Sequence, residues 1–296
     1  MSSDIEQLRE KLFSKEFSKF CKAEFSTLQR TLEQEKRKRI KKSLLYMSLL
    51  ILLLVVACSQ GINPFFLIII LAVILICGVY PYGKYIDNVK KMIIPKLLSF
   101  VGEFKILDPY DKLYRIDKFV KSLRLFDNHN DCSCSDFIVG KYKGLKIRIA
   151  EIYLTRESDE NKVVVFNGIL LSFETTKKFP TDIIIKDNKE KVYESADRVY
   201  LEDPEFEKLY DVYSMNQIAA RKIITPAFMQ RLVKYSRKGK ITLSFENGRI
   251  NIAIKSNKNW FRIPTSSNQD NINVYRKYIL DLIQLLSIIE HLKLNI

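Results

Sequence analysis

Histidine and glycine are scarce in this chain. Of its 296 residues, two are histidine and nine are glycine. A nucleophile activated by imidazole is nearly excluded, since the second histidine, His291, lies in a segment whose apolar spacing is typical of a structural helix. The glycines are not spaced as a GxGxxG or GxxxxGK(S/T) phosphate loop, and no GxSxG elbow occurs. The sequence therefore predicts no catalytic residue and no bound cofactor.

Cysteine is also sparse, and its spacing excludes a disulfide framework. Only Cys132 and Cys134 could meet in a folded domain outside the apolar runs, so a reducing compartment fits best. Together with His129 they are weak candidates for metal ligands. The spacing HxxCxC is not a standard zinc pattern, and the sequence has no CxxC motif to provide a second pair of ligands. A polar loop is the favoured interpretation, and no metal is predicted.

Charge is absent from residues 43–82, which contain two apolar runs, Leu44–Cys58 and Phe65–Tyr80. An uncharged break, SQGINP, separates the runs and has the composition of a turn. A helix needs roughly 20 apolar residues to cross a bilayer, with about 17 as the practical minimum, and each run reaches that length with its flanks. The sequence therefore predicts a transmembrane helical hairpin, with the lipid bilayer as a partner.

Positive charge gathers immediately before the first run and sets the expected orientation. The net charge is +15, and the densest basic block consists of Lys36, Arg37, Lys38, Arg39, Lys41 and Lys42. Lysines also follow the second run, while the break between the runs has none. By the positive-inside rule, both termini are expected in the cytoplasm of a bacterial cell, with the hairpin in the inner membrane. Nucleic acid is an unfavoured partner, because basic and aromatic residues are not interleaved in a patch.

One alternative changes this topology. Val55-Val56-Ala57-Cys58 matches the end of a lipoprotein signal, with a basic region and an apolar region before a small residue and cysteine. Lipidation at Cys58 would allow the large domain to lie outside the cell. The late position of the basic block and the second apolar run favour the hairpin.

Residues 1–42 predict an amphipathic helical arm. Apolar residues recur every three or four positions from Leu8 to Leu32, without Pro or Gly between them. The arm contains several phenylalanines, so its apolar face needs a protein surface or the headgroup region. We favour packing on the chain's own domain or on a second copy.

Residues 83–296 predict an α+β domain with an antiparallel sheet and a carboxyl-terminal helix. Strands are expected on both sides of a Lys143-Gly144 turn, and Asn247-Gly248 is typical of a two-residue hairpin turn. Gly168 is expected to mark a bulge in a third strand. Thr225 and Pro226 are expected to cap and start a helix. The last helix is expected from about Val274 to Leu294.

Three segments resemble a known family. They are Leu201–Leu232 (LEDPEFEKLYDVYSMNQIAARKIITPAFMQRL), Phe166–Phe179 and Ser244–Ile254. With the arm and the hairpin, they resemble the bacterial membrane proteins grouped as domain of unknown function 3137. The resemblance implies an architecture and no activity, and it brings no catalytic residues. Asn216 and Lys222 stand where the family pattern usually has an acidic and an aromatic residue.

The residues of Leu201–Leu232 mainly specify the fold, because they predict short capped helices on either side of a strand. A ligand groove formed by Tyr213, Gln217 and Arg221 is the functional alternative. For the whole chain we expect a cytoplasmic binding or scaffold domain held at the membrane by the hairpin. The alternatives are an enzyme acting on a lipid headgroup or another membrane-proximal substrate, and a subunit of a transport complex.

Overall fold

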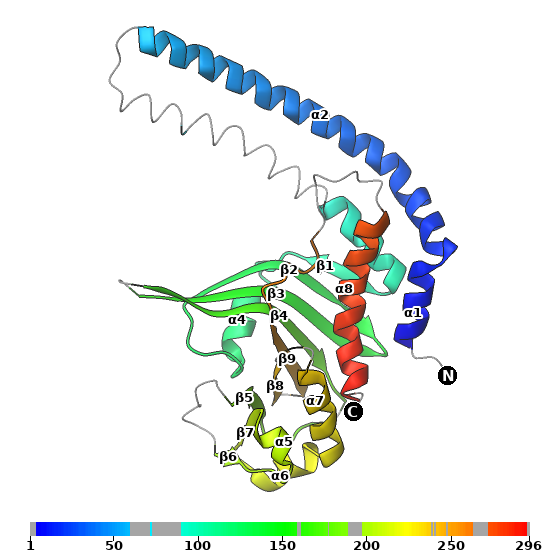
Figure 1. The fold of residues 1–296 in the computed structure, drawn as a ribbon, viewed down its shortest axis with the longest axis vertical. Coiled ribbons are helices and arrows are strands. Elements are labelled where there is room, and N and C mark those ends of the chain that lie inside the picture. Colours follow the sequence, from blue (N-terminus) through cyan, green and yellow to red (C-terminus); the bar gives the residue numbers. More distant parts are fainter. Residues whose placement is uncertain are drawn as a thin grey trace. The chain divides into compact units, whose positions relative to one another are not determined.

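A computed structural model describes most of the chain (Figure 1). The described residues are 4–59, 72, 90–158, 161–176, 178–188, 197–237, 239, 241–246, 248–262 and 272–294, without the side chains of 27–33, 35, 36, 57 and 58. The chain divides into two compact units. The first consists of residues 1–9, 98–262 and 277–296, and the second of residues 10–97 and 263–276.

The predicted amphipathic arm is helical, and it consists of two helices. Helix α1 runs from Asp4 to Phe13 and α2 from Lys15 to Ser59. They meet at Ser14, whose hydroxyl donates to the Lys11 carbonyl and accepts from the Glu16 amide. In the second unit the arm buries four side chains on one face, in keeping with its periodicity: Leu12, Phe17, Cys21 and Phe25.

The structure describes mainly the first of the two apolar runs in the predicted hairpin. Leu44–Cys58 continues α2 without a break. Phe65–Tyr80, the second run of the expected hairpin, lies outside the described residues except for Ala72. Among the helices within the described ranges, none combines the length and the apolar content that membrane crossing requires.

The first unit is built on one antiparallel sheet. Within the described residues, nine strands pair in the order β1-β2-β3-β4-β9-β8-β5-β7-β6. The strands are β1 Phe104–Leu107, β2 Asp131–Tyr142, β3 Leu145–Glu157, β4 Lys162–Glu174, β5 Ile183–Asp187, β6 Arg198–Val199, β7 Tyr210–Ser214, β8 Ile241–Glu246 and β9 Arg249–Lys255. The antiparallel α+β class and the carboxyl-terminal helix are confirmed.

Helices cover both faces of this sheet (Figure 1). On one face lie α7, Pro226–Ser236, and α8, Ile272–His291. Phe228 of α7 stacks edge-on against Phe245 of β8, and Tyr142 of β2 hydrogen-bonds Glu290 of α8. On the opposite face, α4, Ile116–Ser122, joins a core that contains side chains of β2, β3, β4 and β9. Two short helices, α5 (Pro204–Glu207) and α6 (Gln217–Ile223), flank β7 in the chain.

Local turn chemistry explains the hairpins, with one correction. Lys143 and Gly144 both adopt positive φ, as the turn between β2 and β3 requires. Gly168 was expected to mark a bulge, and this prediction was wrong, because the register of β3 and β4 shifts at Leu154/Thr155 instead. Glycine stands at 168 because a Cβ there would lie 2.0 Å from the Ile254 carbonyl oxygen of β9.

A buried polar network crosses three central strands. The Ser172 hydroxyl donates to the Asn251 side-chain oxygen at 2.6 Å, and Ser244 donates to a Glu246 carboxylate oxygen at 2.6 Å. The Asn251 amide donates to Ser244 and to Glu246. All four residues are at most 4% exposed. Burial raises the pKa of Glu246, and Asp182 raises it further.

We expect Glu246→Gln to change how stability depends on pH. Because the folded-state pKa is raised, the Glu246 contribution is fully present below about pH 4.5 and is lost as pH rises through the folded pKa. Glutamine keeps the accepting oxygen and cannot ionise. The variant should equal the parent at low pH and exceed it at pH 8. Urea unfolding followed by Trp260 fluorescence tests this, and a constant difference at all pH values would contradict it.

Candidate functional site

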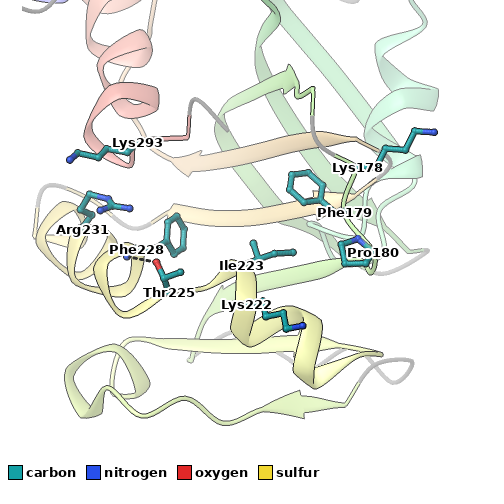
Figure 2. Close-up of a pocket in the computed structure, with 9 residues that line it drawn as sticks. All are labelled: Lys178, Phe179, Pro180, Lys222, Ile223, Thr225, Phe228, Arg231 and Lys293. Atoms are coloured by element: carbon teal, nitrogen blue, oxygen red, sulfur yellow. Dashed lines mark hydrogen bonds between the residues drawn. The ribbon is translucent and has the colours of Figure 1, made fainter.

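A pocket of about 300 Å³ opens in the first unit, between α6, α7, the end of α8 and the segment after β4 (Figure 2). Its lining combines apolar and cationic side chains. The lining residues are Lys178, Phe179, Pro180, Lys222, Ile223, Thr225, Phe228, Arg231 and Lys293. Among these described residues none is acidic.

The apolar wall is part of the core. Phe179 and Phe228 both pack edge-on against Phe245, with ring centroids 5.4 and 6.0 Å away. Thr225 caps α7, since its hydroxyl accepts from the Phe228 amide at 3.3 Å. The same turn brings Ile223 into the wall (Figure 2). The predicted cap and helix start at Thr225 and Pro226 are therefore confirmed, and they also shape the pocket.

The cationic side chains come from four separate segments. Arg231 is fixed in place, because its Nε donates to the Leu292 carbonyl at the end of α8. Lys293 follows in a left-handed conformation, with φ of 50°, where α8 ends. Figure 2 shows Arg231 directed toward Phe228, while the ammonium groups of Lys178 and Lys293 point outward. Chemically, this arrangement suits an anion that has an apolar part.

The predicted ligand groove does not coincide with this pocket. Tyr213 is 3% exposed, and its hydroxyl donates to Asp211 at 3.4 Å. Gln217 and Arg221 lie one turn apart on α6, both exposed, and Arg221 donates to the Tyr200 carbonyl. None of the three lines the pocket, whereas Lys222, the next residue, does. The groove of Tyr213, Gln217 and Arg221 stays a prediction, separate from the pocket.

The weak metal candidates lie at the start of β2. Cys132 and Cys134 lie two residues apart on the strand, so their side chains point to the same face, and burial raises their thiol pKa values to about 11 and about 12. His129 Nδ1 contacts the Asp127 carbonyl. No group of three potential metal ligands occurs within the described part of the chain. Protonated, partly buried thiols are poor metal ligands.

The predicted membrane-flanking basic block lies within α2. Arg37, Lys38, Lys41 and Lys42 are exposed, and Arg39 is partly buried. Lys36 belongs to the helix, but its side chain is outside the description. The block therefore continues directly, as helix, into the apolar run.

Sequence reasoning identified none of the nine lining residues as site residues. Lys178, Phe179 and Pro180 follow β4 in a stretch without strong periodicity, and Lys293 lies beyond the last helix. These residues meet only through the sheet and the packing of α8. The one usable signal was the Thr225-Pro226 helix start, which lies in the segment used for the resemblance.

A family model matches part of the chain. Residues 164–294 match the family model described as "Protein of unknown function (DUF3137)". The three segments that carried the resemblance all fall within this range. No curated protein matches the chain.

One solved structure is similar to the chain. It is the crystal structure of the mycobacterial trehalose monomycolate transport factor A, TtfA, at 13% sequence identity. The match covers 53% of this chain and 74% of that one, with a TM-score of 0.32. A likeness at this score carries no argument about fold or function.

Proposed function

Residues 164–294 match the DUF3137 family model, and from this premise we propose that the chain is a membrane-anchored binding protein for anions with an apolar part. The single observation that carries the proposal is the pocket, whose lining includes two aromatic rings and four cationic residues and no carboxylate. The ligand's charge would be met by Arg231 and Lys222, and the lysines at the rim, Lys178 and Lys293, would add positive potential. Its apolar part would lie against Phe179 and Phe228.

The size of the pocket favours a small ligand or one end of a larger one. About 300 Å³ lies at the lower limit of ordinary ligand sites. Phe228 is 5% exposed and belongs to the core, so the apolar wall is preformed. Arg231 is held by the Leu292 carbonyl, and a guanidinium with this fixed position loses little freedom on binding.

The anchoring part of the proposal is supported by α2 and by the sequence. Leu44, Leu45, Leu49, Leu52 and Val55 are each more than half exposed, and the run from Leu44 to Cys58 has no charged residue on any side of the helix. A helix that is apolar on every side needs apolar surroundings. The basic block before this run and the charge-free residues 43–82 support a hairpin in the inner membrane with both ends cytoplasmic. No feature specifically favours the enzyme or transport alternatives over binding.

Phenyl phosphate is a suitable probe for the pocket, because it joins a dianion to one aromatic ring and stays in water. The full chain would be placed in phosphatidylcholine nanodiscs and titrated calorimetrically. We expect Lys222→Gln and Arg231→Gln each to raise the Kd by about tenfold, the value of one charge-assisted contact. Benzyl alcohol, which lacks the charge, should bind far more weakly.

Lys234→Gln is the matched control, since Lys234 is exposed on α7 and does not line the pocket. It removes the same charge and should leave the Kd unchanged. Equal weakening in all three variants, or no binding by the parent, would contradict the proposal. For anchoring, the chain should stay with membranes after alkaline carbonate extraction. A Lys234→Cys variant without native cysteines should react with an impermeant maleimide only in opened cells.

A further inference from the structure

Two arginines converge on the sheet face opposite the pocket. Antiparallel partners point to the same face, and the register pairs Arg148 of β3 with Ser172 of β4, and Arg249 of β9 with Glu174 of β4. Arg148 and Arg249 therefore project from strands on either side of β4 toward the side covered by α4. Phe245, which supports the pocket, precedes Glu246 on β8 and points the other way.

Both guanidinium groups lie over one ring, that of Phe119 of α4. The Cζ atom of Arg148 is 5.3 Å from the ring centroid, and that of Arg249 is 5.7 Å away. Cation–π contacts of this kind hold a guanidinium in place without neutralising it. Two like charges are thus held close together beside a fixed apolar surface.

Nearby carboxylates do not balance this charge. Glu174 contacts Lys146 at 3.4 Å and Arg249 at 3.2 Å, so one carboxylate serves two cations. No ion pair of Arg148 is found in the described part of the chain. Burial lowers the pKa of Arg148, and the charge of Arg249 lowers it further. Glu246 of β8 is the register partner of Arg249 and adds a second carboxylate to this face. Three cations against two carboxylates leave a local charge of +1, and burial, which raises the pKa of Glu246, favours its neutral form.

We propose that Arg148 and Arg249, with Lys146, bind a phosphate monoester group. A planar guanidinium presents paired donors that match phosphate oxygens, and a dianion would relieve the repulsion between the two arginines. The site is open to solvent, since the side chains of Lys146, Glu174 and Arg249 are 70%, 37% and 30% exposed. The group could belong to a soluble phosphate or to a phosphomonoester lipid headgroup, which share this chemistry.

The test titrates inorganic phosphate into the full chain in phosphatidylcholine nanodiscs. A Lys222→Gln background weakens the pocket on the other face, so that site contributes little. We expect Arg148→Gln to raise the phosphate Kd by tenfold or more. Lys118→Gln, which removes an exposed charge from α4, should change it by less than twofold. Arg148→Lys keeps the charge and loses the paired donors, so its Kd should be intermediate.

The outcomes separate the sources and the alternatives. If the protein binds phosphatidic acid vesicles better than phosphatidylcholine vesicles, and if this difference requires Arg148, the ligand is a lipid headgroup. If phosphate binding requires Arg148 but the protein binds both kinds of vesicle equally, the ligand is a soluble phosphate. Equal affinity in Arg148→Gln and its parent, or an equal loss in Lys118→Gln, would overturn the proposal. Thermal melting of each variant shows whether a loss of phosphate binding is due to unfolding. If Arg148→Gln does not fold, the phosphate Kd of Arg148→Lys tests the proposal instead: a Kd equal to that of the parent would overturn it.

Discussion

Gly168→Ala is expected to lower the free energy of unfolding by about 4 kcal/mol, the sum of a steric and a backbone contribution. The added Cβ would lie 2.0 Å from the Ile254 carbonyl oxygen and 3.0 Å from the Ser256 amide nitrogen. Both neighbours are backbone atoms and cannot rotate away. The φ of 154° adds strain for any residue with a side chain. Because Gly168 pairs with Lys255, the change forces β4 and β9 apart at the centre of the sheet.

Urea unfolding followed by Trp260 fluorescence measures this effect, because Trp260 is the one tryptophan and is 5% exposed. Gly144→Ala is the matched control. Gly144 also has positive φ, at 81°, but its ideal Cβ meets nothing within 4 Å. Its expected loss is about 1 kcal/mol, from conformation alone. Equal losses in the two variants would show that the close approach at Gly168 is not rigid.

Phe25→Ala should detach the arm from its own unit without unfolding the sheet. Phe25 is fully buried, and its ring lies 4.6 Å from that of Tyr275. Truncating a buried phenylalanine costs about 3–5 kcal/mol. The neighbouring ion pair between Lys96 and Glu24, at 2.7 Å, is about 40% exposed and offsets little of this loss.

Hydrogen exchange shows which part of the chain loses stability in Phe25→Ala. Amides of α2 near Phe25 should exchange much faster in the variant, while those of β8 and β9 keep their protection. Phe13→Ala is the control, because Phe13 is 62% exposed and its loss should stay below about 1 kcal/mol. A uniform increase across both units would mean that the chain unfolds as one body.

Features set by neighbouring residues were predictable from the sequence. The β8–β9 hairpin follows from its two-residue turn, and the start of α7 follows from Thr225 and Pro226. The burial of Phe17 and Phe25 follows from helical spacing. In each case the residues that decide the structure lie within a few positions of one another.

Features set by distant residues were not predictable. The place of β5 between β8 and β7 depends on packing alone, and no local pattern encodes it. Helix α4 gave no signal, since Arg115 at its start provides no side-chain cap and the helix has seven residues. The pocket was missed for a similar reason, because Lys178 and Lys293 come to line one pocket only after α8 has packed.

One hydrogen bond has a consequence for how this domain can vary. The Thr175 amide donates to the Gly248 carbonyl at 2.9 Å, so the ends of the segment between β4 and β9 are held together. That segment contains every pocket residue except Lys293. Insertions or exchanges inside it need not displace the paired strands that close it. Relatives could thus bind different ligands through changes in the segment between β4 and β9 alone, while the rest of the sheet keeps its structure.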